Sequence, residues 1–203
     1  MAELPLVMMV NAQVPAKTVE EFIALANAKP DAMSYSTSGA GSSMHLAAEM
    51  FKSGSGTAVQ HVPYRGGGPA VGDLLAGHVQ LCFATVLESS GHLKSGKVRA
   101  LAATSKARPR LFPEVPTVAE LGWPGFEVTA WYGFVVPRGT PKAAADALRA
   151  AALDTVADPA VRARLEGEGG EVIGAGPEAF AAMMRAESAR WAEIVARGGI
   201  TAD

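Results

Sequence analysis

Two glycine-rich turns, each lying between a predicted strand and a helical pattern, constrain this sequence more than any other feature. Residues 33–37 are predicted to form a strand, which passes into the glycines and serines at 38–43. Residues 58–63 are predicted to form another strand, which passes into the turn at 65–69, where proline follows three glycines. Glycine allows a sharp reversal after a strand, and proline is common where a helix begins. Both units therefore predict a strand, a turn and a helix.

The same alternation of strands and helices continues along most of the chain, which favours an α/β fold over an all-α or all-β fold. Threonine followed three residues later by glutamate predicts capping boxes at Thr18 and Thr117, the second opening a one-turn helix. We expect an α/β body over residues 11–135, followed by a mostly helical tail. The predicted strands are 4–10, 33–37, 58–63, 79–84, 98–104 and 131–137, and the predicted helices begin near residues 18, 43, 69, 86, 117, 141, 159 and 177.

Composition excludes several classes of protein. The chain has 203 residues, enough for one large domain or two small ones, and 49% of them are hydrophobic. The formal net charge is −2 and no long run of lysine or arginine occurs, so we expect no nucleic-acid partner. No apolar run approaches the ~18 residues of a membrane-spanning helix. Residues 1–10 lack a basic segment and a cleavage pattern, so we expect no signal peptide in this chain.

Cysteine and histidine give no sign of a metal site. Cys82 is the only cysteine, which excludes an intrachain disulfide and a multi-cysteine site, and its apolar neighbours predict a small buried side chain. The four histidines are scattered, and none pairs at a spacing typical of metal ligands. We therefore expect no metal and no cofactor.

The first glycine-rich turn is the strongest candidate site. The helix that follows it begins with unpaired backbone N–H groups and the positive end of its dipole, and nearby hydroxyls add further donors. Such a helix start suits an anionic group, and a carboxylate fits it well. The alternative is an ordinary helix cap made by Ser42 or Ser43. The candidate residues here are Ser36, Ser38, Gly39, Gly41, Ser42, Ser43 and His45.

A second group of candidates follows other predicted strands. Tyr64, Arg65, Gly66 and Gly67 belong to the second glycine-rich turn, and Thr85 follows the strand at 79–84. Turns at strand ends can face one cleft, where open α/β sheets usually bind ligands. We expect Arg65 to point into solvent, whereas the aromatic Trp131 could contact a ligand or the core.

Catalytic motifs are absent from the sequence. It has no Gly-x-Ser-x-Gly elbow, no His-Glu-x-x-His and no phosphate-binding loop. A hydrolase that uses Ser42 or Ser43 with His45 remains an alternative, although residues two or three apart at a helix start rarely direct a hydroxyl onto an imidazole.

Six segments, taken in order and spacing, resemble the Bug or TctC-like receptors of tripartite tricarboxylate transporters. The resemblance runs from about Leu4 to Ala202. The segments are STSGAGSSMHL at 36–46, HVPYRGG at 61–67, DLLAGHV at 73–79, GKVRALA at 96–102, PEVPTVAE at 113–120 and WYG at 131–133.

This resemblance implies a periplasmic-binding-protein type of fold (class II-like), whose two lobes close on a small carboxylate. It implies a periplasmic receptor that serves membrane transporter subunits and is not an enzyme. It also implies that residues 11–135 form the complete ligand-binding second lobe, and that 1–10 and 136–203 form a partial first lobe with C-terminal helices. Ser38, Gly41, Ser42, His45, Tyr64, Gly66, Gly67 and Thr85 would then line one wall of the cleft.

The sequence departs from the family pattern in two ways. Members usually carry about a hundred further residues before the equivalent of Leu4, so we expect an uncovered first-lobe surface that could form a homodimer. Many members also have an acidic residue where Ala84 stands, which makes amino-acid ligands less favoured here than plain carboxylates. The reading we adopt is a carboxylate-binding receptor, with a small hydrolase and a non-binding dimeric interaction module as alternatives.

Overall fold

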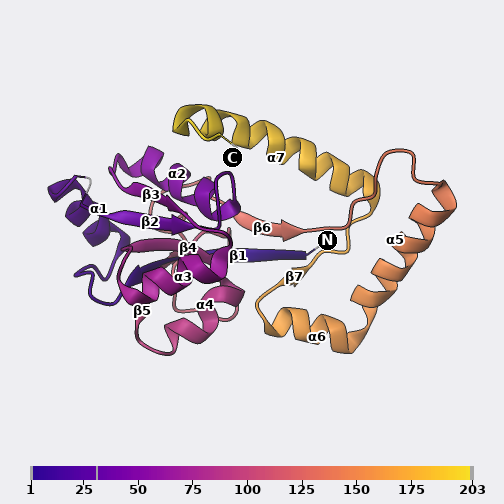
Figure 1. The fold of residues 1–203 in the computed structure, drawn as a ribbon. Coiled ribbons are helices and arrows are strands. Elements are labelled where there is room, and N and C mark those ends of the chain that lie inside the picture. The colour runs from indigo at the N-terminus through magenta and orange to yellow at the C-terminus, as the bar shows by residue number, and fades with distance from the viewer. Residues whose placement is uncertain (1, 31, 202–203) are drawn as a thin grey trace.

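The computed structural model describes residues 2–30 and 32–201 and has a mixed α/β architecture, which confirms the expected fold class (Figure 1). Five strands form the main sheet in the order β3-β2-β4-β1-β5, with β2 parallel to both β3 and β4 and with β1 antiparallel to β4 and β5. These strands are β1 (Ala2–Asn11), β2 (Ser34–Thr37), β3 (Gln60–Pro63), β4 (Leu81–Thr85) and β5 (Val98–Ala103).

Strand β1 belongs to the main sheet and also pairs with two strands outside it. Its second half pairs with β4 and β5, in a register that sets Leu6 opposite Thr85. Its first half pairs with β6 (Thr129–Tyr132) and with the two-residue β7 (Glu171–Val172), which was not predicted. Residues 6–10 therefore lie in the main sheet, so the division proposed at residue 10 runs through a continuous strand.

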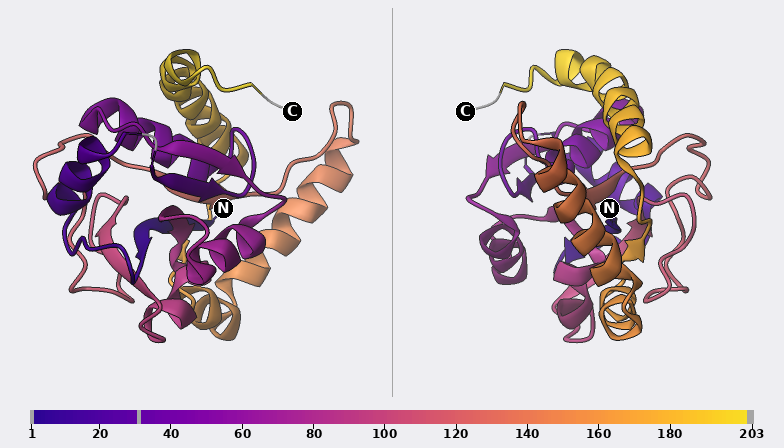
Figure 2. Two further views of the ribbon diagram at one scale, coloured as in Figure 1. Left: turned by 60° about the vertical axis from the view of Figure 1, so that its left-hand side comes forward. Right: turned by 90° about the vertical axis from the view of Figure 1, so that its right-hand side faces the viewer.

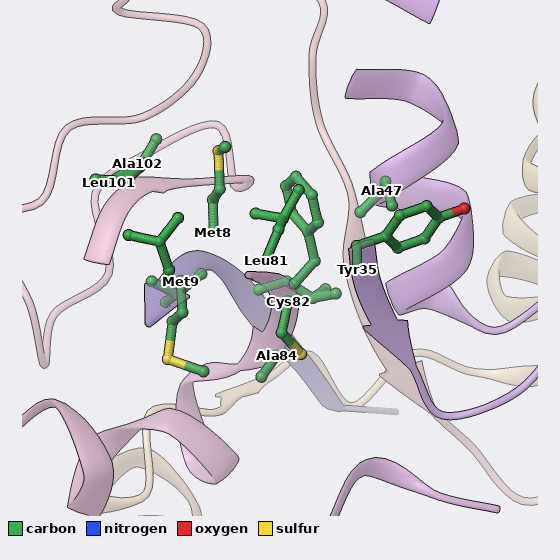
Figure 3. Packing of buried hydrophobic residues seen from close by; sticks show 14 of the residues in the cluster. Met8, Met9, Tyr35, Ala47, Leu81, Cys82, Ala84, Leu101 and Ala102 are labelled. Carbon is green, nitrogen blue, oxygen red and sulfur yellow. The ribbon is translucent and has the colours of Figure 1, made fainter. Parts of the chain in front are cut away.

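The core lies on the main sheet and beneath the helices that follow its strands. Figure 3 shows Met8, Met9, Leu81 and Cys82 packed together in the interior. Cys82 is fully buried as predicted, and burial raises the pKa of its thiol to about 12. The helices of this part are α1 (Val19–Ala28), α2 (Ser43–Ser55), α3 (Gly67–Ala76) and α4 (Val86–Leu93).

Helix starts follow the predicted caps, with two corrections. Thr18 accepts a hydrogen bond from the Glu21 N–H at 3.2 Å and opens α1 as expected. The capping box of Thr117 and Glu120 also forms, but the segment is a turn rather than a helix. Pro69 is the third residue of α3 rather than its first, because that helix already begins at Gly67.

The strand predicted over 131–137 is wrong in its second half. β6 spans Thr129–Tyr132, and the register sets Tyr132 opposite Ala2, at the end of β1. Residues 133–137 are apolar, but they have no adjacent strand and lie exposed, with Phe134 88% accessible. An apolar run without a pairing partner cannot form sheet hydrogen bonds, so the apolar pattern of residues 133–137 predicted a strand that does not form.

The helical tail packs loosely on the body. It contains α5 (Lys142–Ala157), α6 (Pro159–Gly167) and α7 (Pro177–Gly198), of which α7 lies beside α2 while α5 extends away from the sheet (Figures 1 and 2). Neither α5 nor α6 has a buried residue. A cavity of about 540 Å³ lies between α5, residues 133–136 and Phe180, and most of its lining is apolar. No helix in the described part of the chain is both long and apolar enough to cross a membrane.

Candidate functional site

Three helices begin along one edge of the main sheet. Strands β2, β3 and β4 are neighbours and parallel, so their carboxyl ends meet at one edge, and α2, α3 and α4 each start within a few residues of those ends. Figure 1 shows β2 pointing toward the side of the body where β6 lies. The positive ends of three helix dipoles therefore converge on this edge, which we call the sheet-edge site.

The first turn presents the start of α2. Gly39 and Gly41 have φ values of 129° and 72°, which side chains rarely adopt. The Ser42 hydroxyl caps the helix by accepting from the His45 N–H, and it donates to the Gly39 carbonyl at 2.8 Å. Ser42 is thus the helix cap that the alternative foresaw. The backbone N–H groups of Ser43 and Met44 have no acceptor among the described residues, so two donors remain for an anion.

The buried His45 side chain stabilises the first glycine-rich turn. Its Nδ1 accepts a hydrogen bond from the Gly41 N–H at 3.2 Å, its ring stacks on His61 with centroids 3.9 Å apart, and its Nε2 lies 3.8 Å from Glu49 Oε1. Burial lowers the pKa of His45, which favours the neutral imidazole. The Ser42 hydroxyl points to a carbonyl and His45 Nδ1 is bonded to a backbone N–H, so the serine–histidine pair of the hydrolase alternative does not form.

Replacing His45 by asparagine should make stability less dependent on pH. In the wild-type chain, stability is expected to fall as the pH drops below 6.5, because the unfolded imidazole binds a proton that the folded one resists. Asparagine can keep an acceptor for the Gly41 N–H but does not titrate. Urea unfolding at pH 7 and pH 5 measures the effect, and an equal loss of stability in both proteins would refute it.

The second turn is tied to the first. The Gly66 N–H donates to the Ser38 carbonyl at 3.3 Å, and the Gly39 Cα faces the carbonyl of Tyr64. The Tyr64 hydroxyl donates to Asp73 within its own unit, and burial and this carboxylate raise its pKa to about 12. Arg65 is exposed, in accord with the prediction that it points into solvent.

The third helix start carries a residue that sequence reasoning missed. Glu88 forms a capping box with Thr85: its Oε2 accepts from the Thr85 N–H at 3.0 Å and from the Thr85 hydroxyl at 2.8 Å. This box returns the carboxylate to the end of β4. The argument from Ala84 did not consider this carboxylate, and the preference for plain carboxylates over amino acids stays a prediction. The signal was present, because Thr85 and Glu88 have the same spacing as Thr18 and Glu21.

Of two further predicted residues, Ser36 is turned away from this edge and Trp131 lies beside its first turn. Ser36 is fully buried, and its hydroxyl donates to the Ala70 carbonyl, which ties β2 to α3. Trp131 packs edge-on against Phe180, and it lines a cavity of about 480 Å³ between α2, β6 and α7. Gly41 and Ser43 line the same cavity. The structure brings together Ser38, Gly39, Gly41, Ser42, Ser43, His45, Tyr64, Gly66, Gly67 and Thr85.

Side chains that bind metal ions are not grouped at the sheet-edge site in the described part of the chain. Within residues 2–30 and 32–201, no group of three or more histidine, cysteine or acidic side chains could hold a metal ion. The arrangement offers backbone N–H groups and hydroxyls, which suit hydrogen bonding to a small anion.

Comparison with known proteins gives one consistent family. The family described as the tripartite tricarboxylate transporter family receptor, TctC, matches residues 1–200. The chain is 36% identical over 195 residues to the UPF0065 protein in the tcbD-tcbE intergenic region of Pseudomonas sp. (strain P51), covering 96% of this chain and 58% of that protein. It is 32% identical over 197 residues to the protein BugT of Bordetella pertussis, covering 97% and 60%. The chain thus spans about three fifths of these relatives' length.

Solved structures agree in fold over nearly the whole chain. Rpa4515 of R. palustris with adipate superposes with a TM-score of 0.93 at 31% identity, covering 100% of this chain and 68% of the other. MatC (Rpa3494) from Rhodopseudomonas palustris with bound malate gives 0.90 at 30% identity, covering 96% and 67%. The predicted periplasmic-binding-protein type of fold is confirmed by these matches. The chain belongs to the tripartite tricarboxylate transporter receptor (TctC) family.

Proposed function

We propose that this chain binds a small organic carboxylate at the sheet-edge site, as a solute-binding receptor or as part of one. The observation that carries the proposal is the convergence of α2, α3 and α4 on one edge of the sheet. The N–H groups of Ser43, Met44, Gly67 and Gly68 have no protein acceptor in the described part of the chain. Hydrogen bonds to a charged group contribute about 1.5–3 kcal/mol each. A few such donors can therefore hold a carboxylate without a lysine or arginine.

The relatives support the choice of ligand class. Adipate and malate accompany two structures of the same fold, and both are dicarboxylates. In this proposal Ser38, Gly39, Gly41, Ser43, Gly66, Gly67 and Thr85 face the ligand. Ser42, His45 and Tyr64 hold the two turns in shape through the hydrogen bonds described above. Ser36 has no part in the contact surface, because its hydroxyl bonds inside the core.

Membership of the family supports a proposal about location and partners. We propose that the chain acts in the periplasm and delivers its ligand to membrane transporter subunits. We also propose that residues 11–135, together with residues 6–10 of β1 in their sheet, form the ligand-binding lobe, and that 1–5 and 136–203 belong to a first lobe. The apolar cavity beside α5 fits a surface that another polypeptide covers, and a homodimer through this surface remains a proposal.

A thermal-shift screen tests the proposed ligand class. The panel contains mono-, di- and tricarboxylates and aromatic acids, with amino acids and sugars as comparison compounds. A ligand at a hundredfold excess over its dissociation constant stabilises the folded state by about 2.7 kcal/mol. A saturable rise in melting temperature with one class of carboxylate is expected. A screen in which sugars shift the melting temperature and carboxylates do not would reject the proposal.

A further inference from the structure

Glu88 places a carboxylate at the sheet-edge site. It lies at the third position of α4, its side chain is half-buried, and it forms no ion pair with a lysine, arginine or histidine of residues 2–30 and 32–201. A carboxylate in a site that attracts anions opposes the binding of a second negative charge nearby. Its presence therefore bears on which anions can bind.

Only one of the two carboxylate oxygens is used for helix capping. Oε2 accepts both hydrogen bonds from Thr85, whereas Oε1 has no donor among the described residues. Oε1 lies against the Cα of Gly67, where an added Cβ would be 1.8 Å from it. The carboxylate thus reaches from the start of α4 to the start of α3, and Gly67 leaves the space that it occupies.

The position of Glu88 also connects to β6. Burial is the main cause that raises the pKa of the Tyr132 hydroxyl, and the negative charge of Glu88 raises it further. Tyr132 ends β6 and is 56% exposed. Glu88 is therefore within electrostatic reach of three elements around the site: α3, α4 and the end of β6.

We propose that Glu88 sets ligand specificity, with Oε1 accepting a hydrogen bond from a hydroxyl or ammonium group on the ligand. This inference rests on the proposed function. Within the proposed ligand class it favours carboxylates that carry such a donor, such as hydroxy and amino acids. An acid without a donor leaves Oε1 unpaired on binding, and burial of an unpaired charged acceptor is unfavourable. A site built to bond a donor rejects analogues that lack it more strongly than a purely apolar pocket does.

The test uses three four-carbon dicarboxylates that differ only at carbon 2: succinate with hydrogen, malate with a hydroxyl and aspartate with an ammonium group. Isothermal titration calorimetry compares the wild-type chain with Glu88→Gln and Glu88→Ala. Glu120→Gln is the matched control, because Glu120 forms the same kind of capping box with Thr117 outside the site. Unfolding by heat in the absence of ligand checks that each variant folds.

The wild-type chain should bind malate or aspartate at least about tenfold more tightly than succinate, which is the worth of one hydrogen bond. Glu88→Ala should remove this preference, and Glu120→Gln should retain it. Glu88→Gln should keep a preference for malate, because glutamine retains an acceptor, but lose one for aspartate, because it lacks the charge. If all three acids bind with the same rank order in wild type and Glu88→Ala, the inference is overturned and the proposed function stands. If no acid binds to any of the proteins, both are overturned.

Discussion

Replacing Phe51 by alanine should lower the free energy of unfolding by about 3–5 kcal/mol, the usual cost of removing a large aromatic side chain from a core. Phe51 lies on α2 and is fully buried. Its ring centroid lies 6.2 Å from that of Phe22, 5.9 Å from Phe83 and 5.5 Å from Trp123. One side chain thus joins α2 to α1, to β4 and to the segment before β6. Its removal leaves a cavity bordered by three rigid rings, which cannot easily close.

Urea unfolding followed by circular dichroism measures this loss. Domains are typically stable by only about 5–15 kcal/mol, so the effect should be large. Leu148→Ala is the matched control, because Leu148 is 58% exposed on α5 and its replacement should change stability by less than about 0.5 kcal/mol. A loss below 1 kcal/mol in Phe51→Ala would show that α2 does not pack on the core as described.

Replacing Ser43 by proline should weaken carboxylate binding by about 10- to 100-fold, the equivalent of one charged hydrogen bond. Ser43 is the first residue of α2, where proline is well tolerated. Ser42 before it has φ −66° and ψ 161°, a conformation that a residue preceding proline readily adopts. The substitution therefore removes one backbone N–H from the sheet-edge site and is expected to leave the helix intact.

Ser43→Ala provides the control for this experiment. It removes the hydroxyl but keeps the backbone N–H, so the difference between the two variants isolates the backbone donor. Calorimetric titration with the acid that gives the largest thermal shift should show near wild-type affinity for Ser43→Ala. Equal affinities for Ser43→Pro and Ser43→Ala would mean that the start of α2 does not contact the carboxylate.

Local signals in the sequence predicted the framework of the site. Thr18 and Ser42 cap helices as expected, because a cap depends on residues within one turn of each other. The alternation of strands and helices predicted that glycine-rich turns would follow β2 and β3 at one edge. The position of β1 between β4 and β5 depends on pairing between distant segments, which no local pattern encodes.

The errors in the prediction also arise from contacts between distant segments. The sequence placed Ser36 among the ligand contacts, but only its pairing with α3 reveals that its hydroxyl turns inward to Ala70. Residues 133–137 have the composition of a strand but no neighbouring strand. Glu88 had the spacing of a capping residue, yet its approach to Gly67 comes from the packing of α4 beside α3 and could not be read from spacing.

The most direct test of the account is a nuclear magnetic resonance titration of the ¹⁵N-labelled chain with malate, adipate and, as a control, glucose. We predict saturable shifts of backbone amide signals at the starts of α2 and α3, namely at Ser43, Met44, Gly67 and Gly68, with either dicarboxylate and not with glucose. Saturable shifts confined to α5 and residues 133–136, or no saturable shift with either acid, would contradict carboxylate binding at the sheet-edge site.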